Sequence, residues 1–539
     1  MKHTVRSIME DLVSVQSDTG TKMEIDAAEK IGRYFEEDDY FSAHPELFGI
    51  EDTGDFLGRT VVWALKRGRG KKTIVLTGHY DAVEIESYGA LKDFALSPEK
   101  LKREIIKRGM GDAKVKEHLQ SDHWVFGRGT ADMKGGLALG IYETLKVCAC
   151  TDVSVLFVAL CDEENLSAGA RSAVDVLLKI KDKFDLEYKG IFILEPQIQQ
   201  EKDKFLIYSG SIGKVMPLVV VKGKLAHSAS PLKGINSAHL LAEIVSEIDM
   251  STELVTCDKG QKTQVPMVQM MRDLKEVYDV SIPEYSAAYF NLLFLGGENG
   301  ESLLKTIGQL AGSGANAYME KFKKAFEMTY GADAPKEERV DFDAPLIVDI
   351  ERLEEMVRKL KPDFASWKKD VIVSLTADIQ KGRLTLQDAS VKYVRELLAQ
   401  VEVGGPIIVI GICPPYYPSV QNGYMDEGYQ KYVSVINSSV KLRGNMELKE
   451  VPYFTGIGDG SYFSYVDGEK ERTMVDKLIL PQEIYNIPVS KSVKIGAPCF
   501  YLGPRCEDMH QWSERVYMPD LEELLPAILD DLIEYIGKE

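Results

Sequence analysis

The chain has 539 residues, of which 45% are hydrophobic and 28% are charged, a composition that is ordinary for a globular protein. This length exceeds what one hydrophobic core holds and predicts roughly two to four domains. The formal net charge of −19 argues against nucleic acids and anionic membrane surfaces as partners, because both are bound by clustered cations.

The segments that would direct a chain to or across a membrane are not recognisable in the sequence. No apolar run approaches the roughly 18 residues that a membrane-spanning helix needs. The first twenty residues, MKHTVRSIMEDLVSVQSDTG, have acidic residues within the apolar pattern, so they predict an amphipathic helix and not a secretory signal. The seven cysteines have no recurring spacing, and CAC at 148–150 has neither zinc-knuckle nor redox-pair spacing. These features predict a protein of the reducing cytoplasm.

The first two hundred residues alternate strand-like and helix-like segments. The predicted strands are 60–68, 72–81, 152–164 and 188–197, and the predicted helices are 135–148 and 167–180. Short apolar strands separated by helices of about a dozen residues indicate an α/β sheet, parallel in good part and covered by helices on both faces. In such sheets, ligands bind just beyond the carboxyl ends of the strands.

From about residue 212 the pattern changes to that of a separate α+β domain. Its predicted strands are 212–224, 263–274, 286–297 and 405–415, with helices at 236–250 and from 301 onward. The charged, helical segment at about 331–400 looks like an insertion within this domain.

After about residue 418 the α/β pattern returns. It comprises a helix at about 427–440, the glycine-rich segment 456–461, a strand at 497–503 and a helix at 521–537. We therefore predict one discontinuous α/β catalytic domain, 1–211 and 418–539, with an α+β domain, 212–417, inserted into it.

Polar residues of the metal-ligand type follow the predicted strands. In TGHYDAVE, residues 77–84, a histidine and an aspartate stand two apart at the end of an apolar run. The full set is His79, Asp81, Asp132, Glu163, Glu164, Glu195 and His510. Any one of them alone reads as a solvated loop residue. Together, two imidazoles and several carboxylates suit zinc or a related divalent ion, and a bridging carboxylate would allow two ions about 3.5–4 Å apart.

The ordered motifs GHYDAV, GRGTADMKGG, DEEN and EP, with a late histidine before E-R-V, resemble the co-catalytic zinc hydrolases that include acetylornithine deacetylase, succinyl-diaminopimelate desuccinylase and glutamate carboxypeptidase. The resemblance implies a zinc-peptidase-like catalytic domain with a mainly parallel sheet, and an inserted lid domain through which a homodimer is expected. Within this family, the length, the enlarged lid, GICPPYYPS and CEDMHQWSERV resemble members linked to arginine utilisation.

The resemblance also implies a role for each strand-end residue. Asp132 would bridge two divalent ions, with zinc expected and cobalt or manganese as alternatives. His79 and Glu195 would complete the site of one ion, and Glu164 and His510 that of the other. Asp81 would accept a hydrogen bond from His79 and fix its tautomer, and Glu163 would be the general base. The Asp132–Met133 peptide bond is usually cis in this family.

Residues outside the strand ends have weaker signals. His227, in KLAHSASP, matches a lid histidine that stabilises the oxyanion across a dimer, although it also reads as a strand-end histidine. Asp459 and Ser461, in GIGDGSYFS, either line the substrate pocket or form a tight turn. Asn291 stands on the strand where many relatives carry an arginine for a substrate carboxylate.

Three further residues, Arg272, Glu514 and His239, carry weaker signals still. Arg272 lies on a neighbouring segment and does not match that arginine by motif. Glu514 is expected behind His510, and His239 is expected to be packed on an apolar helix face.

These observations predict a two-metal amidohydrolase that cleaves an amide bond of a small peptide or N-acyl amino acid, with a link to arginine and amino-acid catabolism. The alternative is a non-catalytic metal-binding or regulatory protein that keeps the fold. A structural zinc site is disfavoured, because such sites are built from cysteine and histidine. Three roles stay open for the insertion: extending a dimer interface, covering the pocket, or binding a partner.

Overall fold

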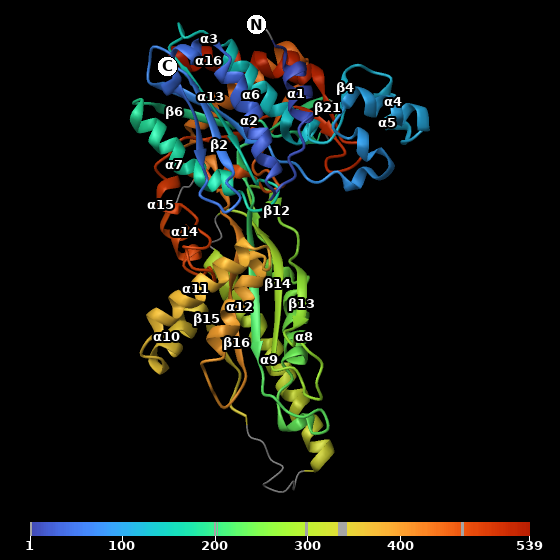
Figure 1. The fold of residues 1–539 in the computed structure, drawn as a ribbon, viewed down its shortest axis with the longest axis vertical. Helices are drawn as coiled ribbons and strands as arrows, with labels where there is room; N and C mark the ends of the chain where they lie inside the picture. Colours follow the sequence, from blue (N-terminus) through green and yellow to red (C-terminus); the bar gives the residue numbers. More distant parts are fainter. Residues whose placement is uncertain (1–2, 199–200, 202, 297–299, 332–341, 465–467) are drawn as a thin grey trace. The chain divides into compact units, whose positions relative to one another are not determined.

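The computed structural model describes residues 3–198, 201, 203–296, 300–331, 342–464 and 468–539 (Figure 1). The chain forms two compact units. The first comprises Met1–Ser211, Val420–Val466 and Pro488–Glu539, and the second comprises Ile212–Ser419 and Asp467–Ile487.

The segment Asp467–Ile487 lies with the second unit, whereas we expected all of 418–539 in the catalytic domain. The reason is a backbone pairing with β16, Ile407–Tyr417, a long strand of the second unit. Ile412 donates its N–H to the carbonyl of Lys477, and Ile479 donates its N–H to the carbonyl of Ile412.

The first unit is built on an eight-stranded mixed sheet in the order β1-β2-β5-β3-β6-β19-β8-β18. The strands are β1 Phe48–Asp52, β2 Thr60–Lys66, β3 Lys72–His79, β5 Ser154–Leu160, β6 Glu187–Ile193, β8 Lys204–Tyr208, β18 Glu447–Val451 and β19 Cys499–Tyr501. The four central strands, β5, β3, β6 and β19, are mutually parallel. Their carboxyl ends therefore meet at one edge of the sheet.

The central strands are apolar along their whole length. Every residue of β5 is buried, as is every residue of β3 after Lys72. This pattern indicates a sheet covered on both faces, as predicted, because an exposed face would carry polar residues at alternate positions. Each fully buried valine or leucine stabilises the fold by about 1.5–3 kcal/mol.

Helices of the first unit pack on this sheet and on one another. Among them, α6 and α16 contact β3, and α7 contacts β5 and β2. The helices are α1 Val5–Val13, α2 Met23–Glu36, α3 Asp39–Ala43, α4 Pro98–Arg108, α5 Ala113–Leu119, α6 Gly135–Lys146, α7 Ala168–Lys183, α13 Gln430–Ser439, α15 Val489–Ser492 and α16 Leu525–Lys538. The predicted amphipathic N-terminal helix is confirmed as α1, which buries its apolar face.

Two smaller sheets complete the first unit. One has the order β4-β21-β20-β7, and the other pairs β17 with β9. These strands are β4 Trp124–Phe126, β7 Gln197–Ile198, β9 Gly210–Ser211, β17 Val420–Gln421, β20 Arg505–Glu507 and β21 Arg515–Tyr517. The antiparallel pair β20–β21 matters for the site, because His510 lies in its connection.

Residues 85–126 form a small apolar cluster with α4 and α5 that we did not predict. Its buried members include Leu91, Leu101, Ile105 and Phe126. The sequence signal is weak, because α4 (PEKLKREIIKR) is mostly charged. Near the end of α6, Cys148 and Cys150 are joined in a disulfide, which the sequence did not predict either.

The second unit contains a five-stranded sheet in the order β13-β14-β10-β16-β15. The strands are β10 Gly213–Lys222, β13 Met267–Asp273, β14 Tyr285–Phe294, β15 Leu346–Asp349 and β16 Ile407–Tyr417, with a separate pair, β11 Cys257–Asp258 and β12 Gln261–Lys262. The helices are α8 Ser237–Ile248, α9 Gly300–Tyr330, α10 Ile350–Leu360, α11 Phe364–Gln380, α12 Leu386–Leu398 and α14 Gly468–Val475.

Helix α8 packs on β10 and β14 and runs beside α9 (Figure 1). The expected helical insertion contains α10, α11 and α12 in its described part; residues 332–341 of it lie outside the described residues. An α/β unit with a second α+β unit is the fold class that the sequence predicts. In the part of the chain that the structure describes, no helix has both the length and the apolar character needed to cross a membrane.

Candidate metal centre

Three neighbouring parallel strands deliver polar side chains to one edge of the central sheet. His79 is the last residue of β3, Glu163 and Glu164 follow β5, and Glu195 follows β6. Because β3 lies between β5 and β6 in the sheet, these side chains emerge side by side. The strand-end pattern in the sequence is therefore a pattern in space as well.

Asp132 and His510 reach the same place from loops. Asp132 lies in the turn before α6, and its peptide bond to Met133 is cis, as the resemblance predicted. Glycines allow the close packing around this turn and the Glu195 segment. A Cβ at Gly136 would collide with the carbonyl of Leu194, and one at Gly503 would collide with the carbonyl of Glu195.

The ligand-type atoms form two groups that share Asp132. In the first, His79 Nε2 lies 3.1 Å from Asp132 Oδ1 and 3.2 Å from Glu195 Oε1. In the second, His510 Nε2 lies 3.0 Å from Asp132 Oδ2 and 3.1 Å from Glu164 Oε1. The ligand atoms of each group lie within 4.8 Å of one another. Each oxygen of Asp132 thus faces a different pair of one imidazole and one carboxylate.

Glu163 lies beside the first group without belonging to either. Its Oε2 is 4.0 Å from His79 Nε2, farther than the oxygens of Asp132 and Glu195. Burial, together with the nearby charges of Glu195, Asp459 and Glu164, raises the pKa of Glu163 well above its usual value, although His79 opposes this shift. A carboxylate with a raised pKa beside the site has the affinity for a proton that a general base needs.

Asp81 holds both the histidine and the loop after β5. His79 Nδ1 donates to the backbone carbonyl of Asp81 at 3.0 Å, while the carboxylate Oδ1 is 3.5 Å away. Asp81 therefore accepts a hydrogen bond from His79, and the nearest acceptor atom is its main-chain carbonyl oxygen. This bond places the proton on Nδ1 and leaves Nε2 available as a ligand. The two carboxylate oxygens instead accept the N–H groups of Glu163 and Glu164, each at 3.1 Å.

Asp132 lies between the imidazoles of His79 and His510. Burial alone would raise the pKa of Asp132, but hydrogen bonds from His510 and His79 hold it well below its usual range. Burial raises the pKa of Glu195 to about 7. Hydrogen bonds to Asp132 and Glu164 raise the pKa of His510 to about 10. The cluster thus concentrates negative charge that a cation would stabilise.

The donor set fits a pair of divalent cations. Nitrogen from imidazole and oxygen from carboxylate are the ligands that zinc takes in catalytic sites, where a position stays open for water or substrate. The buried His79 closes one side of the site, whereas the side chain of His510 is 50% exposed and leaves the other side accessible. A carboxylate shared between two ions is typical of two-metal sites.

Arg128 and Glu514 support the turn that carries Asp132. Glu514 Oε1 accepts the N–H groups of Ala131 and Asp132 at 3.3 and 3.4 Å, and its Oε2 pairs with Arg128. Arg128 also donates to the carbonyl of His510 at 3.1 Å. The position of Glu514 agrees with the expectation from the sequence. Arg128 was missed, although its place in GRGTADMKGG was a usable signal.

Asp459 and Ser461, predicted as pocket residues, both lie inside the first unit. Asp459 is 3% exposed and Ser461 is fully buried, with its hydroxyl 3.1 Å from that of Ser211. Burial raises the pKa of Asp459 to about 8, although a hydrogen bond that the carboxylate accepts from Ser167 opposes this rise. Their binding of substrate stays a prediction.

The remaining candidates belong to the second unit. His227 is exposed in the loop after β10, and its Nδ1 accepts the N–H of Ala229 at 3.0 Å, so its Nε2 carries the proton of the neutral ring. Asn291, on β14, has a buried Oδ1 with no hydrogen-bond partner among the described residues. Arg272 donates to Asp388 at 2.6 Å. His239 is half-exposed, packs edge-on against the ring of Tyr318, and has its Nε2 3.2 Å from Glu243.

The chain is similar to other proteins along its whole length. It is 29% identical to the uncharacterized protein YqjN of Bacillus subtilis, over 100% of this chain and 97% of YqjN. It is 24% identical to Protein RocB of the same organism, over 97% of this chain and 93% of RocB. A crystal structure of a tripeptidase from Staphylococcus aureus has the same fold, with a TM-score of 0.52 at 13% identity over 99% of this chain and 98% of that chain.

The family model described as peptidase family M20/M25/M40 matches residues 75–464. This range starts within β3 and ends after the segment of Asp459, so it includes most of the strand-end residues described above. Because the match extends over more than half of the chain, the protein is a hydrolase of the peptidase and deacylase type and a member of peptidase family M20/M25/M40.

Proposed function

We propose that the protein hydrolyses an amide bond of a small peptide or N-acyl amino acid with the help of two divalent metal ions, zinc in the first instance. One observation carries this proposal. The two carboxylate oxygens of Asp132 face two different imidazole–carboxylate pairs. His79 and Glu195 would hold one ion with Asp132, and Glu164 and His510 the other. Such an arrangement has no use in a purely structural zinc site, which is closed by cysteine and histidine.

We assign a different role in hydrolysis to each of the remaining site residues. Two bound ions would supply Lewis acidity that polarises the substrate carbonyl and lowers the pKa of a water molecule. Glu163 takes the proton of the attacking water and delivers it to the leaving nitrogen. Asp81 keeps the backbone of Glu163 and Glu164 in place. Across a homodimer, His227 of the partner subunit would donate a hydrogen bond through its Nε2–H to the oxyanion of the tetrahedral intermediate.

Metal content is the direct test of this proposal. Elemental mass spectrometry of the purified protein should find about two ions per chain, and fewer in His79→Ala, which removes the imidazole of the first group. His44→Ala serves as the matched control, because His44 is an exposed histidine of the same unit that pairs with Glu46. Absence of metal from the wild type, even after zinc or cobalt is added, would contradict the proposal.

The role of His227 gives a second, independent test. His227→Ala is expected to lower kcat by about 10²–10³-fold, the usual loss for one oxyanion donor, with KM and metal content unchanged. His239→Ala is the control, because His239 is also exposed and lies in the same unit. Steady-state kinetics on a hydrolysed substrate measure both variants. Unchanged turnover in His227→Ala would exclude the oxyanion role.

The substrate class can be narrowed by a panel of dipeptides and N-acyl amino acids. We propose that it includes intermediates of arginine or general amino-acid catabolism, because residues 411–419 and 506–516 resemble the arginine-utilisation members of the family. We also propose a cytoplasmic protein that forms a homodimer through the second unit. Metal-loaded protein that hydrolyses nothing in the panel would favour the alternative, a non-catalytic metal-binding protein.

A further inference from the structure

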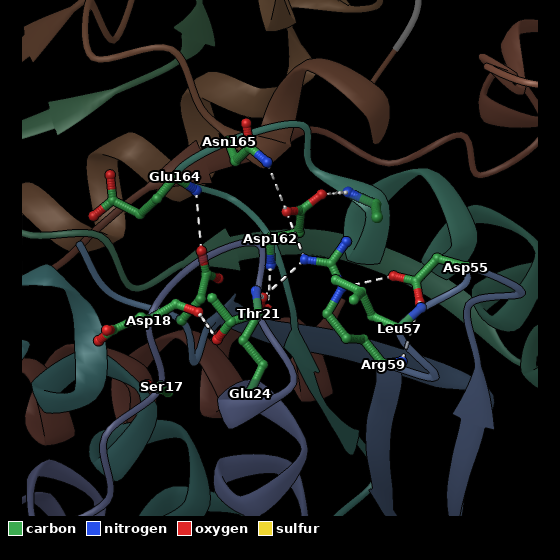
Figure 2. A network of polar contacts seen from close by, with 12 residues as sticks. Ser17, Asp18, Thr21, Glu24, Asp55, Leu57, Arg59, Asp162, Glu164 and Asn165 are labelled. Atoms are coloured by element: carbon green, nitrogen blue, oxygen red, sulfur yellow. Dashed lines mark hydrogen bonds and ion pairs between the residues drawn. The ribbon is translucent and has the colours of Figure 1, made fainter. Parts of the chain in front are cut away.

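A buried arginine, Arg59, stands behind the loop that carries Glu163 and Glu164. Its side chain is only 6% exposed. Its Nη1 donates to Glu24 Oε1 at 2.8 Å and to Asp162 Oδ1 at 2.6 Å, and its Nε donates to Asp55 Oδ2 at 2.6 Å. Figure 2 shows the guanidinium among these three carboxylates, with Glu164 and Asn165 following Asp162 on the loop. Arg59 and its three carboxylate partners, Glu24, Asp55 and Asp162, belong to neither metal group.

Asp162 is the centre of the turn between β5 and α7. Its φ of 65° is in the left-handed region, which aspartate tolerates better than most residues. Its carbonyl accepts the N–H groups of Asn165, Leu166 and Ser167. Its Oδ2 accepts the N–H of Ala168, the first residue of α7, at 3.2 Å. The conformation of the turn is therefore fixed by hydrogen bonds that the carbonyl and the carboxylate of Asp162 accept.

Glu24 binds both Arg59 and the main chain of Asp162. Its Oε1 accepts from Arg59, and its Oε2 accepts the backbone N–H of Asp162 at 2.8 Å. Glu24 lies on α2 and is fully buried. Both the side chain and the main chain of Asp162 are thus tied to the Arg59–Glu24 pair, immediately before the two glutamates of the site.

We propose that Arg59, acting with Glu24 through Asp162, is a positioning residue that sets where Glu163 and Glu164 stand. The Asp81 carboxylate holds the N–H groups of the two glutamates on the site side, and the Arg59–Glu24 pair holds Asp162 on the other. With Arg59 removed, the buried carboxylates of Glu24 and Asp162 and the partly buried carboxylate of Asp55 would lose their common cation, and such groups rearrange. The Asp162 turn would then loosen, and both glutamates would move with it.

This inference rests on the proposed function for its effect on catalysis, so its test includes a measurement that needs neither metal nor substrate. Hydrogen–deuterium exchange of metal-free protein reports the stability of the backbone N–H groups in residues 162–168. In Arg59→Met, which keeps the length of the stem but not the charge, these groups should exchange about tenfold faster or more. In metal-loaded enzyme, kcat should fall about 10²-fold, the usual result of a small misplacement of catalytic groups, while KM stays unchanged.

Lys146→Met is the matched control. Lys146 pairs with another fully buried carboxylate of the same unit, Glu143, at 2.8 Å and with Asp530 at 2.9 Å, and none of these side-chain bonds involves the loop 162–168. This variant should lower the melting temperature without changing exchange in 162–168 or kcat. Arg59→Lys should recover part of the kcat, because it keeps the charge but not the fork of donors. If Arg59→Met does not fold, Glu24→Gln replaces it, because glutamine offers one oxygen to the three donors that the Glu24 carboxylate now serves, Arg59, Asp162 and Thr21.

The outcomes separate the two proposals. Wild-type exchange and wild-type kcat in Arg59→Met would overturn the positioning role, and so would equal losses in Lys146→Met. Wild-type protein without metal or hydrolysis would overturn the proposed function, whereas faster exchange of 162–168 in Arg59→Met alone would still support the positioning role.

Discussion

Glu163→Gln is expected to lower kcat by about 10³-fold, or about 4 kcal/mol of transition-state stabilisation, while the protein still binds two ions. Glutamine has nearly the shape of glutamate but cannot take a proton from water. Because Glu163 Oε2 lies 4.0 Å from His79 Nε2 and belongs to neither ligand group, its charge is not needed to hold an ion. Steady-state kinetics and elemental analysis of the same preparation measure both effects.

The neighbouring residue offers the sharpest control for this result. Glu164 has the same side chain, and its N–H is held by the same Asp81 carboxylate, yet its Oε1 lies 3.1 Å from His510 in the second group. Glu164→Gln should therefore lose metal as well as activity. Hydrolysis that survives in Glu163→Gln, or metal loss in that variant, would show that the base and the ligand were assigned the wrong way round.

The strand-end residues could be predicted from two features together. Apolar runs in the sequence mark the buried strands, and the parallel order of these strands brings their carboxyl ends to one edge of the sheet. Apolar runs such as TIVL and SVLFVAL mark fully buried strands, and strands separated by helices pair in parallel. The polar residue after each run then falls at the same sheet edge. β5, β3 and β6 follow this rule, which is why His79, Glu164 and Glu195 were recognisable from the sequence.

Arg59 and Glu24 could not be predicted in the same way. Arg59 lies in an irregular, polar segment, EDTGDFLGRT, and Glu24 is one acidic residue of an amphipathic helix. Their partner, Asp162, is distant in the chain and pairs with them only after the sheet has formed. A buried ion pair leaves no periodic signal, because its members are placed by tertiary packing and not by local structure.

Two other differences have the same origin. The sequence predicts that Asp81 accepts a hydrogen bond from His79 but does not tell which of its oxygens does so, and the nearest acceptor is the main-chain carbonyl. The sequence also placed Asp467–Ile487 with the α/β part, whereas its backbone pairs with β16 through Ile412. Both features depend on backbone groups, which carry no residue-specific signal in the sequence.

Asp132→Asn is expected to lower metal content more than any other single substitution at the site and to bring hydrolysis below detection. Each carboxylate oxygen of Asp132 belongs to a different ligand group, and asparagine has only one oxygen, without charge. Three ligand carboxylates against two divalent ions leave about one positive charge, and this substitution raises it to about two, which disfavours binding of both ions. Elemental mass spectrometry and metal titration measure the loss.

His510→Ala separates a bridging role from a general disturbance of the site. It removes the imidazole of the second group and leaves His79, Glu195 and Asp132 of the first intact. One ion per chain should therefore remain in His510→Ala, against fewer in Asp132→Asn. Two tightly bound ions in Asp132→Asn would mean that Asp132 does not bridge, and equal losses in the two variants would mean that the two groups act as one site. If Asp132 is a ligand of both ions, the loss of metal must be larger in Asp132→Asn than in His510→Ala.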